Sequence, residues 1–67
     1  MLVVGRKMGE KVVIPLTMEV LEKLHDRLER GEDVRIEISP LKLTSEGVRI
    51  GIDAPREVLV LREELLE

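Results

Sequence analysis

Hydrophobic and polar positions divide this chain into five short extended segments and one amphipathic segment. Residues 2–6 and 11–14 are mainly apolar, and Met8-Gly9 breaks the pattern between them. Two apolar runs joined by a short connection that contains glycine are typical of a β-hairpin. Pro15 ends the second run, so the chain is predicted to begin with a strand, a tight turn and a second strand.

The next segment follows a helical period instead of an alternating one. Thr17 suits the N-cap of a helix, and Gly31 suits the position just after its last turn. We therefore predict an amphipathic helix over about residues 17–30. Its apolar stripe, which we expect to pack in the core, consists of Met18, Leu21, Leu24 (or His25) and Leu28.

Charged side chains cover the rest of this predicted helix. Glu19–Lys23 and Asp26–Arg30 are spaced four residues apart, with the acid first. Pairs with this spacing stabilise a helix by about 0.2–0.5 kcal/mol each, so we expect two ion pairs on a solvated face.

The second half of the chain returns to a period of two. Residues 34–38 alternate between aliphatic and charged side chains, which is the pattern of a half-buried strand. Pro40 interrupts that pattern, and proline cannot donate to a ladder, so we expect a bulge or an edge position there. The alternation resumes at Leu41 and Leu43, and residues 44–47 form a predicted turn.

Two further strands are predicted around a corner at Ala54-Pro55. Residues 48–53 alternate, and residues 58–61 form an aliphatic run that stops at Arg62. Residues 62–67 form at most the start of a short helix. The whole chain is thus one domain, residues 1–67, with a mainly β fold, one inserted α-helix and the order strand-strand-helix-strand-strand-strand.

Composition adds an argument about assembly. The chain has 67 residues, no Cys and no aromatic residue, so its core is built from 11 Leu, 9 Val and 5 Ile. A domain of this size buries only about 60% of the surface of its unfolded chain. Small chains without disulfides or metals often gain stability by association, and we therefore predict an obligate homodimer.

The net charge and the expected cellular compartment limit the kinds of partner that the chain can bind. The net charge of −3 argues against a non-specific nucleic-acid binder, which needs many phosphate contacts. It leaves room for a protein that reads a short single-stranded site through a few arginine, lysine and backbone groups, because no aromatic platform is present. The absence of Cys, of a signal-peptide pattern and of an apolar run of about 18 residues favours a cytoplasmic protein without a membrane span.

Other chemistry finds little support in the sequence. No Cys nucleophile or evident Ser–base pair is present, so we expect no enzyme activity and no cofactor. His25 is the only histidine, which leaves no multi-histidine metal site within one chain. Arg62, at the end of a strand, and Arg56, near the corner, are instead candidate contacts to an anion or a base edge.

Both ends of the chain resemble the carbon storage regulator family, the CsrA/RsmA translational regulators of bacteria. Residues 1–14 share the family's opening, with Met-Leu, an aliphatic pair, an arginine followed by a basic residue, and Gly-Glu before a strand. Residues 48–65 are similar to its second hallmark, an Arg-aliphatic-Gly strand, an Ala-Pro corner and a strand ending in Arg-Glu-Glu. The two motifs occur in the family's order and cover roughly half of the chain.

The chain departs from the common family pattern at three places. The helix at residues 17–30 stands where most members have a tight turn, which resembles the RsmN-type subgroup with an internal helix. Gly5 replaces the usual Ser or Thr, and Leu61 replaces the common His before the terminal arginine.

The resemblance implies an intertwined β-sheet homodimer of five-stranded subunits. Each RNA site is expected between the first strand of one subunit and the last strand of the other. The implied ligands are GGA-containing loops in mRNA leaders and small regulatory RNAs, and the implied result is repression of translation or altered message stability. The implied RNA-binding residues are Val4, Arg6, Lys7, Ala54, Pro55, Arg56, Val60 and Arg62.

Other interpretations stay open for several of these residues. Arg62 also fits a pair with Glu63 or Glu64, and Arg6 and Lys7 also fit solvated strand ends. Val4 and Val60 are more often core residues than ligand contacts. For the whole chain, the alternative is a protein-interaction module on the same fold, which pairs with other regulators or binds an antagonist protein.

Overall fold

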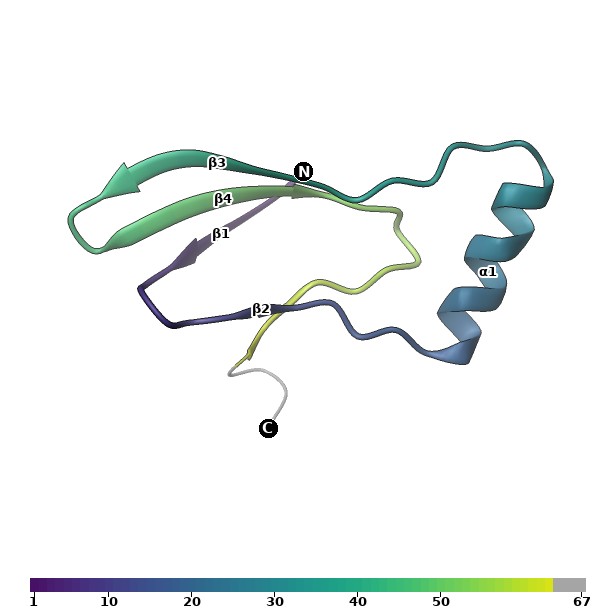
Figure 1. The fold of residues 1–67 in the computed structure, drawn as a ribbon, viewed down its shortest axis with the longest axis horizontal. Helices are drawn as coiled ribbons and strands as arrows, with labels where there is room; N and C mark the ends of the chain where they lie inside the picture. The colour runs from purple at the N-terminus through teal and green to yellow at the C-terminus, as the bar shows by residue number, and fades with distance from the viewer. Residues whose placement is uncertain (64–67) are drawn as a thin grey trace.

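The computed structural model describes residues 1–63 as five strands in two antiparallel sheets with one helix (Figure 1). This confirms the predicted mainly β fold with an internal helix. The elements in chain order are β1 (Leu2–Arg6), β2 (Val12–Val13), α1 (Met18–Glu29), β3 (Glu37–Thr44), β4 (Gly47–Asp53) and β5 (Leu61–Arg62).

The larger sheet has the order β1-β4-β3, so the first strand of the chain lies beside the fourth. Leu2 pairs with Ile52 and Arg6 with Val48 at the two ends of the β1–β4 ladder. The smaller sheet pairs β2 with β5 and thereby brings residues 12–13 against residues 61–62. Both sheets therefore join the N-terminal part of the chain to its last described strands.

The two faces of the larger sheet differ in chemistry, as expected from alternation in a strand. One face carries Val4 and Ile52, which together with Val58 are the buried apolar side chains of the described chain. The other face carries Gly5 on β1 opposite Arg49 on β4, which in turn lies opposite Lys42 on β3. The core is small and lies on one side of the sheet only.

The turn between β3 and β4 forms where it was predicted. The Thr44 hydroxyl accepts a hydrogen bond from the backbone N–H of Gly47 at 3.1 Å and donates to the Gly47 carbonyl at 3.0 Å. A Cβ atom at Gly47 would overlap the backbone carbonyl of Arg6. Glycine is needed here because β1 and β4 approach each other closely at this point.

Pro40 has the effect expected of a proline in a strand. The pairing register between β3 and β4 shifts between Pro40 and Lys42, and β3 is an edge strand of its sheet. A bulge at an edge accommodates the missing N–H donor without leaving a neighbour unpaired.

The helix α1 begins and ends beside the predicted capping residues. The Thr17 hydroxyl accepts from the backbone N–H of Val20 at 3.2 Å, and Gly31 adopts a φ of 80° after the last turn. The Glu19–Lys23 pair is formed at 3.1 Å. The predicted Asp26–Arg30 ion pair is wrong, because the Arg30 guanidinium instead binds Glu32 at 2.8 Å beyond the helix.

The expectation that the α1 stripe packs in the core is also wrong for this chain alone. No residue of α1 is buried, and Met18 and Leu28 are 71% and 57% exposed. Figure 1 shows the reason: α1 lies beyond one end of the sheets and covers neither face of them.

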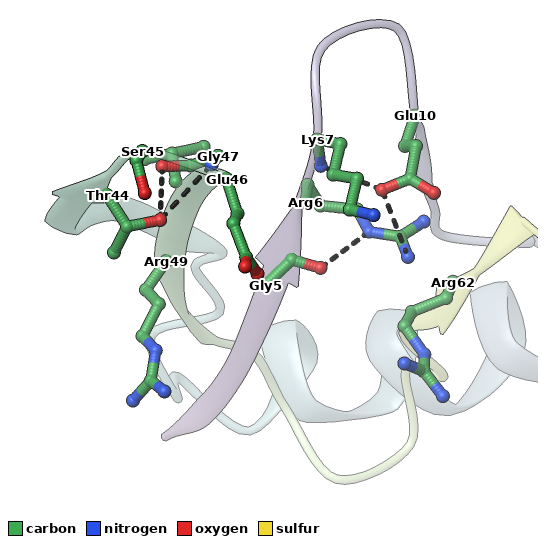
Figure 2. A pocket seen from close by; sticks show the side chains of 11 residues that line it. Gly5, Arg6, Lys7, Glu10, Thr44, Ser45, Glu46, Gly47, Arg49 and Arg62 are labelled. Carbon is green, nitrogen blue, oxygen red and sulfur yellow. Dashed lines mark hydrogen bonds and ion pairs between the residues drawn. The ribbon is translucent and has the colours of Figure 1, made fainter.

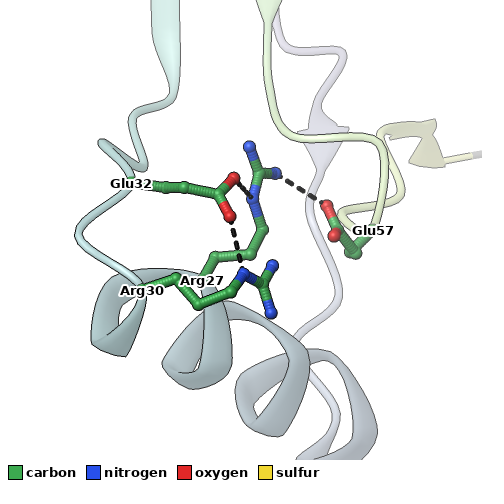
Figure 3. Close-up of polar contacts among 4 residues, drawn as sticks. All are labelled: Arg27, Arg30, Glu32 and Glu57. Atoms are coloured by element: carbon green, nitrogen blue, oxygen red, sulfur yellow. Dashed lines mark hydrogen bonds and ion pairs between the residues drawn. The ribbon is translucent and has the colours of Figure 1, made fainter.

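Ion pairs connect α1 to the rest of the chain (Figure 3). Arg27 binds Glu32 at 3.1 Å and Glu57, in the segment after β4, at 2.9 Å. A backbone hydrogen bond and then Arg27 lower the pKa of Glu57, while Arg30 and then Arg27 lower the pKa of Glu32. The pKa of Arg27 is raised, chiefly by its hydrogen bond to Glu32.

Three predicted strands are shorter than the sequence pattern suggested. The strand expected at residues 58–61 begins only at Leu61, because the backbone N–H of Val58 donates to the Pro55 carbonyl at 2.9 Å and continues the corner as a turn. Residues 11–14 pair only at β2, and the strand expected from Val34 begins at Glu37. The short helix expected over residues 62–67 falls mostly on residues 64–67, outside the described residues.

Candidate nucleic-acid interface

The candidate site is a groove between β1 and the segment that follows β4. It consists of three adjoining hollows, which share Gly5 and Arg62 at one junction and Leu2 and Val60 at the other. Together the hollows contain every residue that the sequence predicted for RNA binding, namely Val4, Arg6, Lys7, Ala54, Pro55, Arg56, Val60 and Arg62. A single chain therefore already brings its first strand and its last described strand to one groove.

The largest hollow, about 490 Å³, lies where the β1–β2 and β3–β4 turns face Arg62 (Figure 2). The backbone N–H of Lys7 donates to the Glu10 carboxylate at 2.7 Å, and the Glu10 N–H donates to the Lys7 carbonyl at 3.0 Å. Gly9 completes this turn with a φ of 84°. The turn therefore fixes the backbone at Lys7, whose side chain is exposed at the rim.

Arg6 occupies a different position from the one expected of a direct ligand contact. It is only 7% exposed. Its guanidinium donates to the carbonyls of Gly5 at 2.8 Å and Lys11 at 3.0 Å, and it lies 3.7 Å from the Glu10 carboxylate. In this conformation Arg6 bonds across the β1–β2 turn, from β1 to Lys11 and Glu10, and so closes the turn that carries Lys7.

The β2–β5 ladder fixes the position of the Arg62 backbone beside β2. Val12 pairs with Arg62, while the backbone N–H of Lys11 donates to the Glu63 carboxylate at 3.2 Å and its carbonyl accepts from the Glu63 N–H at 3.3 Å. These bonds hold β5 beside the turn that carries Lys7. The Arg62 side chain is exposed and lines two of the three hollows.

The Ala-Pro corner forms the other end of the groove. Ala54 and Pro55 are half-buried and Arg56 is exposed, opposite Leu2 at the start of β1. Val60 is half-buried and joins this end to the middle of the groove, where Val4 is buried. The middle is thus apolar, with arginines toward both ends.

The sequence pattern did not single out one basic residue of the groove, Arg49. Arg49 is exposed on β4, directly opposite Gly5, and lines the same hollow as Lys7 and Arg62. Alternation put Arg49 on the polar face of its strand, but only the register with β1 places it beside the groove.

The groove concentrates positive charge in a chain that is acidic overall. Its lining contains five basic and three acidic side chains. Two of the acids, Asp53 and Glu10, are already engaged, by the terminal amine at 3.3 Å and by the Lys7 turn. Among residues 1–63 no cluster of His, Cys, Asp or Glu fits a metal ion, and no helix has the length and apolarity to cross a membrane.

The strand-lined groove, with its basic rim and apolar middle, gathers the residues that the carbon storage regulator pattern implies. Here both walls come from one chain, whereas the pattern implies walls from two subunits. The chain matches the CsrA global regulator protein family over residues 1–67 and belongs to that family. The family is one of global regulator proteins.

Several curated relatives carry the name "Translational regulator CsrA". The chain is 43% identical to the protein from Thermotoga petrophila over 67 residues, which is all of this chain and 59% of that protein. It is 42% identical to the Clostridium acetobutylicum protein over 97% of this chain and 64% of the relative. The Thermosipho africanus protein is 37% identical over all of this chain and 67% of its own length. No solved structure matches the chain.

Proposed function

We propose that this chain is an RNA-binding post-transcriptional regulator, which acts in the cytoplasm as a homodimer on GGA-containing loops. By occupying mRNA leaders it represses translation or alters message stability, and small regulatory RNAs with the same loops compete for it. One observation carries the proposal: all eight residues implied by the family pattern line one continuous groove. The names of the relatives are consistent with it.

The groove suits single-stranded bases. β1 is an edge strand of its sheet, and an edge strand offers unpaired backbone N–H and C=O groups. Bases splayed from a hairpin loop present their hydrogen-bonding edges, which such groups can read without aromatic stacking. Arg62 and Arg56 add bidentate donors for guanine edges or phosphates.

The eight residues divide into two roles by exposure. The exposed cations Lys7, Arg56 and Arg62 bind the RNA directly. The buried Arg6 positions the turn that carries Lys7, and Val4 forms the apolar floor. This division assigns Arg6 an indirect role in binding.

The shape of the isolated chain supports a dimer. Its radius of gyration is 13.9 Å, whereas a folded domain of this length has a value of about 11 Å. Its accessible surface is 5406 Å², whereas a monomeric protein of this mass exposes about 4,300 Å². A second copy would remove the excess apolar surface from water.

A specific apolar surface is available for that second copy. A hollow of about 310 Å³ between β2 and the larger sheet is lined mainly by aliphatic side chains, among them Ile14, Ile38 and Ile50. Leu43 is on the same face of β3 as Ile38 and is 84% exposed. A dimer closed over this face would carry two equivalent grooves, and two grooves on one message raise avidity without new contacts.

Arg62→Ala tests the proposed RNA site. In a gel-shift titration with a GGA hairpin, the variant should bind about 5- to 150-fold more weakly, the range for loss of a specific arginine contact of about 1–3 kcal/mol. Arg35→Ala, which removes an equal charge far from the groove, should bind like the parent protein. Wild-type-like binding by Arg62→Ala, with an unchanged thermal midpoint, would refute the site.

Light scattering after size exclusion tests the dimer. The parent chain should elute with the mass of two copies, and Leu43→Glu should shift it toward one copy. Met8→Glu is the matched control, because Met8 is fully exposed at the tip of the β1–β2 turn. A parent chain that has the mass of one copy at every concentration rules out the homodimer.

The uncovered stripe of α1 favours a second candidate, a protein-interaction module that binds another regulator or an antagonist protein. Its apolar side chains are too exposed to serve the core of this chain alone. Equal binding to a GGA hairpin and to a hairpin with a scrambled loop would favour this candidate over RNA recognition.

A further inference from the structure

The outer face of the larger sheet carries two basic side chains next to each other. Arg49 on β4 and Lys42 on β3 are directly opposite in the ladder, and both are exposed. Directly opposed residues of an antiparallel pair have Cβ atoms about 4.5–5.5 Å apart, and like charges at that spacing destabilise the sheet. No carboxylate among residues 1–63 lies within ion-pair distance of either side chain. The sheet thus keeps a repulsive pair that a bound anion would relieve.

This pair adjoins the groove through Gly5. Gly5 is the partner of Arg49 on β1, and a Cβ at Gly5 would have no atom within 4 Å. Figure 2 shows the Arg49 and Arg62 side chains on either side of Gly5. Because position 5 has no side chain, β1 places no side chain between these two arginines at this point.

We infer that Arg49 and Lys42 form a phosphate-binding extension of the groove, which holds the RNA backbone that flanks the recognised loop. The inference rests on the proposed RNA-binding function and goes beyond its eight residues. The RNA leaves the groove beside Arg62, crosses β1 at Gly5 and places its phosphates against Arg49 and then Lys42. Phosphate contacts fix the position of a nucleic acid but carry no sequence information.

Glu46 is an acidic neighbour of the extension, and its charge should weaken phosphate binding where Arg49 and Lys42 strengthen it. Its side chain lines the same hollow as Arg49, and the carboxylate makes no ion pair with Arg49. Its charge opposes an incoming phosphate. Removing it should therefore strengthen binding of the flanking RNA, whereas removing Arg49 or Lys42 should weaken it.

Salt-dependent binding tests the extension. The probes are a short single-stranded GGA oligonucleotide and the same loop in a hairpin with flanking nucleotides on both sides. The variants are Arg49→Gln, Lys42→Gln, Glu46→Gln and the charge-matched control Arg35→Gln, whose guanidinium binds Asp33 away from the groove. Thermal unfolding of each variant confirms that it is folded.

The parent protein should bind the flanked hairpin more tightly and with a steeper salt dependence than the short oligonucleotide. Arg49→Gln and Lys42→Gln should each reduce the slope of log K against log salt by about 0.7–0.9 on the flanked hairpin, the value for one lost phosphate contact. Lys42→Gln should bind the short oligonucleotide like the parent and keep its preference for GGA over a scrambled loop. Arg49→Gln, whose side chain also lines the hollow with Lys7 and Arg62, should lose more affinity on the flanked hairpin than on the short oligonucleotide. Glu46→Gln should bind the flanked hairpin more tightly than the parent, and Arg35→Gln should match the parent on both probes.

Parent-like slopes for Arg49→Gln and Lys42→Gln on the flanked hairpin, with GGA binding intact, would overturn the extension and leave the RNA-binding function standing. Equal losses on both probes would place Arg49 and Lys42 inside the loop-binding site and would also overturn it. If the parent protein does not prefer GGA on either probe, the proposed function fails and the extension fails with it.

Discussion

The sheet end and the helix end of this molecule are each stabilised by different interactions. At the sheet end, β1, β3 and β4 form a continuous backbone ladder around Val4 and Ile52. At the other end, α1 buries none of its residues and is joined to the segment after β4 by the Arg27–Glu57 ion pair. The contrast shows that sequence-local signals can form a helix without a core beneath it, whereas the sheet needs partners distant in sequence.

The same contrast predicts where substitutions act. Changes in the sheet should reduce global stability and disturb the groove, because β1 and β4 carry both. Changes in α1 should act on the helix and leave the groove in place. Four substitutions or conditions test this difference. All are measured at one fixed protein concentration, because the stability of the proposed dimer would depend on concentration.

The largest effect is expected for Ile52→Ala. Ile52 is 3% exposed in a very small core, and truncating a buried isoleucine costs about 2–5 kcal/mol. Chemical denaturation measures the loss, and Leu28→Ala on the exposed side of α1 is the matched truncation, with an expected cost below about 1 kcal/mol. Equal costs at the two sites would mean that α1 is covered in solution, and the two ends would no longer differ.

Gly47→Ala should destabilise the protein by about 1–3 kcal/mol, because the added methyl overlaps the Arg6 carbonyl. Gly5→Ala is the same chemical change on the neighbouring strand, at a position with open space around it. That variant should gain up to about 1 kcal/mol, since alanine restricts the unfolded chain more than glycine does. Two changes of the same sign would contradict the close approach of β1 and β4.

Thr17→Ala should cost about 1 kcal/mol and lower the helical circular dichroism signal, because it removes the acceptor for the Val20 N–H. Thr17→Asp should retain the helix, since aspartate accepts the same bond. Binding to a GGA hairpin should be unchanged in both variants. A loss of binding by Thr17→Ala would show that α1 and the groove are coupled.

The smallest effect is expected from pH. The pKa values of Glu32 and Glu57 lie below their ordinary value of 4.5 in the folded chain. A lowered folded-state pKa contributes stability that is fully present above the ordinary value and is lost as pH falls through the folded value. The attachment of α1 should therefore weaken below about pH 4.5, while neutral pH leaves it intact.

Amide hydrogen exchange from pH 6 to pH 3, corrected for intrinsic rates, should show protection in α1 falling before protection in β4. Arg27→Met should remove most of that difference, because the cation that binds both carboxylates is gone. Parallel loss of protection in both elements would show that the ion pairs contribute nothing specific to α1.

The sequence predicted the elements whose signals are local. The apolar run at residues 2–6 forms β1, Thr17 and Gly31 bracket α1, and Pro40 marks the register shift in β3. Each of these features depends on a few neighbouring residues, through an apolar run, capping or a missing donor.

What the sequence could not predict depends on partners far along the chain. The aliphatic run at 58–61 pairs only at Leu61, because the Val58 N–H donates to the Pro55 carbonyl and continues the corner as a turn. The burial of Arg6 follows from backbone carbonyls that a residue pattern does not reveal. The place of Arg49 beside the groove follows from its register with Gly5.

The groove is assembled from segments that lie far apart in the sequence, with β1 on one wall and residues 54–62 on the other. During synthesis, a nascent chain that has exposed β1, α1 and β3 still lacks the second wall. The groove is complete only when residue 62 has left the ribosome. A partly made chain therefore cannot use this groove to bind any ligand.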